Sequence, residues 1–398
     1  MATPELPSSF QHLSFVDGVR AAMHRNPEKV ALRHRGRTRT YAQFVERIDR
    51  VSNAIVADAN LPPGAHGAII AKNSIEYLEI VIGAAQVGLA LATINPRLSA
   101  AEMISICEDA EAQIIFADAA SAEHVQDAAI PAAGRVVTIG DAYEAWIAKA
   151  SPSQPDARGR EWDVFTIPYT SGTTGKPKGV LVPHRSRVLT LFAMAQEYGC
   201  FAPEDRFLAM APMCHGAGMV YALAPIFFGG FAEILDRFDP EDFLALLKDQ
   251  GITGYFAVPT HFHGIFGLPQ KVLDARRPDD TLHTVISNAA PLAQSAKEQI
   301  TDYFGPGKLH ETYGSTEAGI VANLRPQDQL RKQKCVGQPF PMTLVKLTDD
   351  DGNDCAADEV GELFSKSPFL INGYWKRPDE TANAFRDGWV TVEDLARR

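Results

Sequence analysis

The sequence predicts an α/β fold in which parallel sheets are covered by helices on both faces. Short apolar runs at 252–258 and 284–287 have the length and composition of buried strands. These runs alternate with helix-like segments, and such alternation is typical of parallel sheets. In sheets of this kind, ligands bind at the loops that leave the carboxyl ends of the strands.

Helix starts are the clearest local signals. Residues 40–43 and 99–102 match the capping box, in which a hydroxyl and a Glu or Gln satisfy each other's backbone amides. Asp239 followed by Pro240 predicts a third start, and Gly251 predicts the end of that helix. Residues 75–92 are apolar on most sides, as expected for a helix that runs into a buried strand.

The chain divides into a larger and a smaller part. We expect two doubly wound α/β subdomains packed together over 1–334, with a polar linker near 151–160. Strand-like segments at 343–347 and 360–365 flank an Asp351-Gly352 turn, which predicts a hairpin within a smaller, β-barrel-like part over 335–398. The acidic residues of that turn lack the spacing of a calcium loop and are expected to be solvated.

Composition excludes several classes of protein. The 398 residues are 45% hydrophobic, which is enough for a large core. A formal net charge of −11 argues against a nucleic-acid partner. No apolar run reaches 18 residues and no signal-peptide pattern opens the chain, so we expect no membrane span. The five cysteines form no Cys-x-x-Cys pair, which favours a cytoplasmic location.

The most informative stretch is 169–180, which follows the strand-like residues 164–168. Glycines let the backbone approach a phosphate closely, hydroxyls donate hydrogen bonds, and lysine supplies positive charge. The spacing differs from a Walker P-loop, because Gly172 and Gly175 are too close together and Pro177 follows the first lysine. The stretch therefore predicts a polyphosphate site of another type.

Further motifs complete a pattern that resembles the adenylate-forming, or acyl-activating, superfamily. Residues 212–218 (Pro-Met-Cys-His-Gly-Ala-Gly), 287–292 (Ser-Asn-Ala-Ala-Pro-Leu) and 311–317 (Glu-Thr-Tyr-Gly-Ser-Thr-Glu) are similar to its successive motifs, and 361–363 and 373–375 continue the order. Residues 73–96 resemble its early region. The resemblance covers nearly the whole chain and implies an acyl- or aryl-CoA ligase of the AMP-forming type.

The resemblance implies roles for individual residues in binding ATP and Mg²⁺. The loop should wrap the β- and γ-phosphates, with Lys178 as the contacting charge, while Thr316 touches the α-phosphate. Glu317 and Thr170 should hold Mg²⁺, since hard cations prefer oxygen ligands. Asp394 should bind the ribose. The cofactor-binding set is Thr170, Ser171, Gly172, Thr173, Thr174, Gly175, Lys178, Ala289, Ala290, Pro291, Glu311, Thr312, Tyr313, Gly314, Thr316 and Asp394.

A second set should surround the acyl group. It comprises His215, Gly216, Ala217, Gly218, Gly314, Ala318 and Gly319, and the catalytic set comprises Lys178, Thr316, Glu317 and His215. His215 is equally compatible with a role in packing. We expect Leu in place of Gly218 to narrow the acyl pocket. His261 and His263 would share one side if that segment were extended, which leaves a weak alternative of metal binding.

Two features depart from the family's pattern. Val392-Glu393-Asp394 stands where the family usually has Thr-Gly-Asp, and the small C-terminal domain that carries the family's catalytic lysine is expected to be absent from these 398 residues. The resemblance implies a small-molecule carboxylic acid, whose identity the sequence does not give, and coenzyme A as substrates. It leaves open a homodimer, an adenylation domain that serves a carrier protein, a luciferase-like oxygenase, and a non-catalytic nucleotide- and acyl-binding protein.

Overall fold

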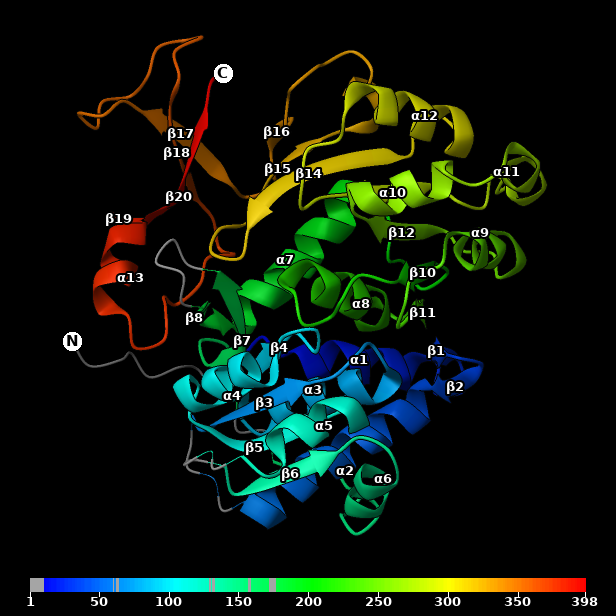
Figure 1. Ribbon diagram of the computed structural model, residues 1–398, viewed down its shortest axis with the longest axis vertical. Helices are drawn as coiled ribbons and strands as arrows, with labels where there is room; N and C mark the ends of the chain where they lie inside the picture. The colour runs from blue at the N-terminus through cyan, green and yellow to red at the C-terminus, as the bar shows by residue number, and fades with distance from the viewer. Residues whose placement is uncertain are drawn as a thin grey trace.

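A computed structural model describes residues 11–59, 61, 64–128, 130, 133–156, 159–171 and 177–398. Three sheets organise these residues (Figure 1). Two are mainly parallel α/β sheets and the third is a small antiparallel sheet, so the predicted fold class is confirmed.

The larger sheet has nine strands in the order β16-β15-β14-β13-β12-β10-β11-β1-β2. Its centre, from β1 to β14, is parallel, and antiparallel strands close both ends. The strands are β1 (Val30–His34), β2 (Arg37–Thr40), β10 (Arg206–Ala209), β11 (Phe231–Ile234), β12 (Gly254–Ala257), β13 (Thr284–Ser287), β14 (Leu309–Ser315), β15 (Gly319–Leu324) and β16 (Gln338–Pro339).

The second sheet has seven strands in the order β6-β5-β3-β4-β7-β8, with β9 also paired to β7. Strands β3 to β7 run parallel, whereas β8 and β9 run antiparallel to β7. The strands are β3 (His66–Ile70), β4 (Ala90–Ile94), β5 (Ala112–Ala117), β6 (Arg135–Thr138), β7 (Val164–Ser171), β8 (Pro177–Gly179) and β9 (Val182–Pro183).

The third sheet has the order β17-β18-β20-β19 and is antiparallel. Its strands are β17 (Leu344–Thr348), β18 (Gly361–Lys366), β19 (Phe385–Arg386) and β20 (Trp389–Ala396). The predicted hairpin is present as β17 and β18. The proposed division of the chain near residue 334 stays a prediction, although β16 lies beyond that point and pairs in the nine-stranded sheet.

Helices fill the space between the two large sheets and cover their outer faces (Figure 1). Helices α1, α3, α7 and α8 contribute to the central core, α9 to α12 pack on the nine-stranded sheet, and α4 and α5 pack on the seven-stranded sheet. The helices are α1 (Phe15–Arg25), α2 (Tyr41–Ala59), α3 (Ile75–Gln86), α4 (Ala100–Asp109), α5 (Ala119–Val125), α6 (Asp141–Ile147), α7 (His184–Tyr198), α8 (Gly216–Phe228), α9 (Pro240–Asp249), α10 (Pro259–Phe266), α11 (Gln270–Arg276), α12 (Gln294–Phe304) and α13 (Pro378–Ala384), with a 3₁₀ turn at Pro326–Asp328.

The predicted helix starts are confirmed. Ser99 and Glu102 form a capping box at α4, and Thr40 and Gln43 exchange the same two hydrogen bonds at α2. Asp239 accepts from two amides at the start of α9. The apolar segment 75–92 divides into α3, which is buried along its whole length, and the buried strand β4. No helix within the described ranges is long and apolar enough to cross a membrane.

His184, the first residue of α7, provides a test of this core through its pH dependence. Its side chain is buried against the ring of Phe165, and neither ring nitrogen has a hydrogen-bond partner. Burial lowers the pKa of His184 to about 4. Its folded pKa lies below the usual value of 6.5, so the unfolded chain binds a proton first as pH falls.

We therefore expect His184 to remove about 2 kcal/mol of unfolding free energy between pH 7 and pH 5. His184→Phe should pack against Phe165 and make the loss of stability over this interval smaller. Urea unfolding of both proteins at pH 7 and pH 5 measures the difference. Equal losses in the two proteins would show that His184 is not a buried neutral imidazole.

Candidate active site

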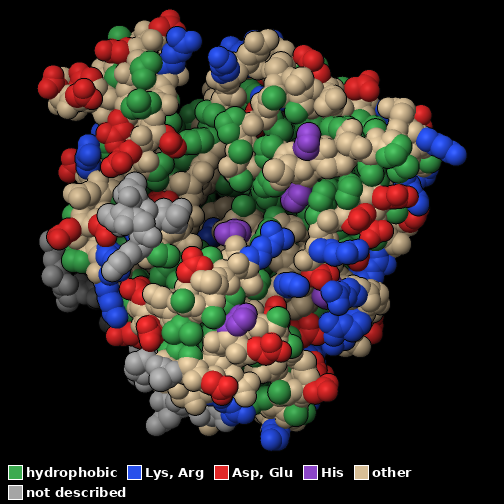
Figure 2. Space-filling view, viewed as in Figure 1, with side chains coloured by type: hydrophobic (Ala, Val, Ile, Leu, Met, Phe, Trp, Pro, Cys, Tyr) green, Lys and Arg blue, Asp and Glu red, His purple; other side chains and the backbone are tan. Residues whose placement is uncertain are grey.

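The predicted site residues gather where the three sheets approach one another. Strand β7 ends at Ser171 and β14 ends at Ser315, and both lead into segments that the sequence predicts to bind nucleotide. The space-filling view shows a deep hollow in the face of the molecule between the lower and upper halves (Figure 2). The site is therefore built from carboxyl ends of strands, as expected for parallel sheets.

The hairpin of β7 and β8 carries the described part of the predicted phosphate loop. Thr170 lies directly opposite Lys178 across the hairpin, so both side chains emerge on one face. The ammonium group of Lys178 pairs with Glu380 and lies 5.5 Å from the ring centroid of Tyr374. Gly172, Thr173, Thr174 and Gly175 lie outside the described residues, and Ser171 is described only in its backbone.

Tyr374 links the hairpin to Glu317. Its hydroxyl donates a hydrogen bond of 3.0 Å to Oε1 of Glu317, while its ring faces Lys178. Burial, followed by the charge of Glu317, raises the pKa of Tyr374, so the hydroxyl remains a donor at neutral pH. Tyr374 therefore brings the predicted metal-binding carboxylate and the predicted phosphate-binding lysine to one place.

Backbone pairing fixes Tyr374 in that position. The amide of Leu181 donates to the carbonyl of Gly373 at 2.9 Å, and the amide of Trp375 donates to the carbonyl of Gly179 at 2.8 Å. Trp375 also donates from its indole to the carbonyl of Asp109 at 2.8 Å. Residues 373–375 are therefore anchored to the segment 179–181 and to the end of α4.

The nucleoside end lies beside β13 and β14. The hydroxyl of Tyr313 donates to Asp394 at 2.5 Å, so the predicted adenine and ribose partners contact each other. Thr312 accepts from Asn288 at 2.8 Å, which ties the turn at 288–291 to β14. The residues of the predicted adenine wall, Ala289, Ala290 and Pro291, are exposed.

Glu311 supports this end from behind. Its carboxylate is buried, accepts from the amide of Leu292 at 2.8 Å and pairs with the buried ammonium of Lys297. These contacts hold the 288–292 turn against β14. Through these contacts Glu311 acts on the predicted nucleotide site indirectly, by positioning that turn.

The segment predicted to line the acyl pocket starts α8. Asn73 fixes it by donating to the carbonyl of Ala211 at 2.9 Å and accepting from the amide of Met213 at 2.8 Å. Thr93 donates to the carbonyl of Cys214 at 2.9 Å. His215 is exposed at the start of the helix, and desolvation by the surrounding protein lowers its pKa.

Gly218 and Gly314 each lie so close to a neighbouring backbone carbonyl that a side chain does not fit. A Cβ at Gly218 would lie 2.1 Å from the carbonyl oxygen of Pro212, and one at Gly314 would lie 2.1 Å from the carbonyl oxygen of Gly319. The expectation that Leu at Gly218 would simply narrow the acyl pocket is wrong, because the side chain would collide with backbone. Ala318 is buried and Thr316 is half-buried between these turns and β15.

Comparison with known proteins identifies the family at this point. The AMP-binding enzyme family matches residues 19–375. The chain belongs to this family.

Curated relatives and solved structures agree with that assignment. A feruloyl-CoA synthase from Amycolatopsis sp is 31% identical over 93% of this chain and 73% of its own length. A 2-succinylbenzoate–CoA ligase from Geobacillus kaustophilus (strain HTA426) is 30% identical over 93% and 72%, respectively. The inhibitor-bound N-terminal domain of FACL13 from Mycobacterium tuberculosis superposes with a TM-score of 0.90 at 25% identity, covering 96% of each chain.

One predicted feature of this AMP-binding enzyme, the segment of His261 and His263, needs correction. His261 and His263 lie in α10 and not on an extended loop, so they point to different sides. The Nδ1 atom of His261 accepts from the amide of Val258 at 3.2 Å, and no metal-ligand cluster exists among the described side chains. The alternative of a metal site there is therefore not supported.

Sequence reasoning missed three residues of the site. Tyr374 was part of a quoted motif but had no assigned role, and Glu380 follows Pro378 at the start of α13. Arg187 lies on α7 directly behind Gly216, with Nη2 3.1 Å from the position of a Cβ there. The sequence carries no signal for Arg187, because its burial in α7 becomes visible only in the folded chain.

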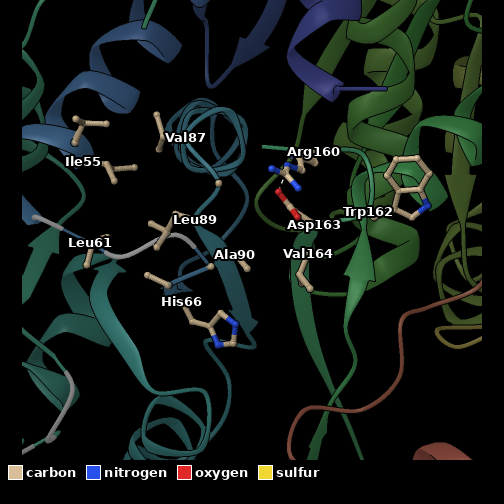
Figure 3. Close-up of a pocket in the computed structure, with 14 residues that line it drawn as sticks. Ile55, Leu61, His66, Val87, Leu89, Ala90, Arg160, Trp162, Asp163 and Val164 are labelled. Atoms are coloured by element: carbon tan, nitrogen blue, oxygen red, sulfur yellow. Dashed lines mark hydrogen bonds between the residues drawn. The ribbon is translucent and has the colours of Figure 1, made fainter. Parts of the chain in front are cut away.

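A second concave region lies at the opposite end of the strands (Figure 3). This cavity of about 1040 Å³ is bordered by His66, Ala90 and Val164, the first residues of β3, β4 and β7. The Nδ1 atom of His66 contacts the carbonyl of Ala110 at 2.9 Å. Because the phosphate hairpin leaves the other end of β7, this cavity is separate from the candidate active site.

Glu393 occupies the position where the family usually has glycine. Its backbone has a conformation that favours glycine. Its φ is 65°, in the left-handed region. We expect Glu393→Gly to raise the free energy of unfolding by about 0.5–1 kcal/mol, because relief of strain exceeds the entropy that glycine adds to the unfolded chain. Chemical denaturation measures this change.

Glu393→Ala is the matched control, because it removes the carboxylate and keeps the Cβ atom. Stabilisation by glycine alone would support backbone strain. Equal stabilisation by both variants would instead assign the effect to the negative charge beside Tyr374 and Glu317.

Proposed function

We propose that this protein activates a carboxylic acid with ATP and transfers the acyl group to coenzyme A. The observation that carries the proposal is the assembly of Lys178 and Glu317 around Tyr374, beside the contact between Tyr313 and Asp394. It provides a cation for phosphates, a carboxylate for a metal, and an aromatic ring with an acid for a nucleoside. The relatives named as CoA ligases support the same activity.

The first reaction step joins two anions. A carboxylate oxygen attacks the α-phosphorus of ATP, the bond to the bridging oxygen breaks, and pyrophosphate leaves with its electron pair. In this proposal Lys178 lowers the repulsion between these anions, and Thr316 orients the α-phosphate. The product is a mixed anhydride in which AMP is a good leaving group.

Thr170 and Glu317 present oxygen ligands of the kind that Mg²⁺ prefers, and they are the residues that would hold it. The ion supplies positive charge to the polyphosphate when bound. The Tyr374 hydroxyl orients Oε1 of Glu317.

The second step forms the thioester. The sulfur of coenzyme A attacks the acyl carbon, AMP leaves with the bonding electrons, and the thiol proton passes to solvent.

We further propose that the protein acts in the cytoplasm. The five cysteines form no disulfide bonds, as is usual in that reducing compartment.

Calorimetry with ATP and Mg²⁺ tests the nucleotide site. Lys178→Ala should weaken ATP binding about 10- to 100-fold, since a charge-assisted contact is lost. Glu317→Gln should reduce the dependence of ATP binding on Mg²⁺. Lys308→Ala is the control, because Lys308 precedes the opposite end of β14. Unchanged binding in both site variants would show that the nucleotide binds elsewhere.

Pyrophosphate release with a panel of carboxylic acids tests catalysis. We expect release that depends on the acid, and thioester formation when coenzyme A is added. Tight ATP binding without acid-dependent release across the panel would support the non-catalytic binding protein instead. If pyrophosphate is released but the acyl group is transferred only to a carrier protein, the acceptor is a carrier protein and not coenzyme A.

A further inference from the structure

Arg187 is a buried cation at the edge of the predicted acyl pocket. It lies one turn into α7, is 8% exposed, and packs where α7 meets α8. Its Nη2 atom lies 3.1 Å from the position of a Cβ at Gly216. Because Gly216 has no side chain, nothing from that residue separates the guanidinium from the space beside the start of α8.

The guanidinium of Arg187 has no partner in the part of the chain that the structure describes. Its Nε atom has no hydrogen-bond acceptor, and no ion pair or other hydrogen bond involves the group. Burial alone lowers the pKa of Arg187 to about 10, so it remains charged at neutral pH. An uncompensated buried charge is strongly unfavourable, and proteins usually pair such charges.

Three other buried or half-buried cations among the described residues follow that rule. Arg47 pairs with Glu79 at 2.6 Å and with Glu144 at 2.7 Å. Arg20 pairs with Asp49 at 2.7 Å, and Lys297 pairs with Glu311. Arg187 therefore differs from these cations, and the missing partner has the chemistry of an anionic ligand.

The position of Arg187 assigns that anion to the acyl side of the site. Lys178 is the described cation at the phosphate hairpin, where Glu317 and Tyr374 also lie. Arg187 forms no ion pair with Glu317 or Glu380, the carboxylates of that group. Gly216, beside Arg187, belongs instead to the segment that holds His215 and Ala217 at the start of α8.

We propose that Arg187 binds a second carboxylate on the acid substrate and that the protein activates dicarboxylic acids. This inference rests on the proposed function. The reacting carboxylate must meet the α-phosphate near Thr316, and the other carboxylate would accept two parallel hydrogen bonds from the planar guanidinium. The second carboxylate of the substrate then neutralises the guanidinium of Arg187, which has no partner within the described part of the protein.

Matched ligands and variants separate this role from a structural one. The probes are aliphatic and aromatic dicarboxylic acids, each compared with its monomethyl ester, which keeps the skeleton and removes one charge. The variants are Arg187→Met and Arg185→Met. Arg185 lies on the same helix but pairs with Glu161 at 2.6 Å, so it controls for loss of an arginine from α7.

Calorimetry in the presence of ATP and Mg²⁺ should show that at least one dicarboxylic acid binds about 10- to 100-fold more tightly than its monoester. Arg187→Met should abolish that preference, and Arg185→Met should keep it. Without ligand, Arg187→Met should raise Tm, because an unpaired buried charge is replaced by an apolar side chain. The preferred dicarboxylic acid should raise Tm of the original protein and not that of Arg187→Met.

Three outcomes would overturn the inference. They are equal affinity for acids and monoesters, an unchanged preference in Arg187→Met, and an equal loss of both ligand types, which would place the reacting carboxylate at Arg187. In each case pyrophosphate release with monocarboxylic acids would leave the proposed function intact. Absence of release with every acid would instead contradict the proposed function itself.

Discussion

The antiparallel pairing of residues 179–182 with 371–375 is the constraint on which the site depends. In this pairing the amide of Asn372 donates to the carbonyl of Leu181 at 2.8 Å, and the amide of Leu181 donates to the carbonyl of Gly373 at 2.9 Å. Val180, Val182 and Ile371 are buried together at the junction. Because this short ladder connects the β7–β8 hairpin to the segment before α13, it brings Tyr374 to Lys178 and Glu317.

Charge placement gives the cleft a direction. In the proposed function Lys178 and Glu317 form the phosphate and metal end, and in our further inference Arg187 forms the acyl end. Lys178 is already paired with Glu380, so an incoming polyphosphate competes with an internal carboxylate. Arg187 has no competing carboxylate among the described residues, so an anion binding there restores a missing interaction.

Local signals allowed much of the fold to be predicted. The caps at Thr40, Ser99 and Asp239 depend on neighbouring residues only, and the strand predicted at 284–287 agrees with β13. The segment at His261 was misread because its apolar residues fit either a short strand or a helix, and Pro259 at the first helical position was the overlooked signal.

The site was predictable only in part. Motifs indicated Lys178, Glu317 and Tyr313 as candidates, but a motif does not reveal which side chains meet across 57 residues of sequence, as Tyr374 and Glu317 do. Gly218 was misinterpreted because sequence does not show that its Cα faces the carbonyl of Pro212. Arg187 could not be recognised because the absence of a partner is a property of the folded chain.

Transfer of ¹⁸O from a labelled acid tests the central claim most directly. The acid, labelled in both oxygens of the reacting carboxyl, is incubated with this protein, ATP, Mg²⁺ and coenzyme A, and the nucleotide products are analysed by mass spectrometry. Attack of the carboxylate on the α-phosphorus predicts AMP that carries one ¹⁸O atom and pyrophosphate that carries none. Formation of ADP with label in inorganic phosphate, or of AMP without label, would contradict the account.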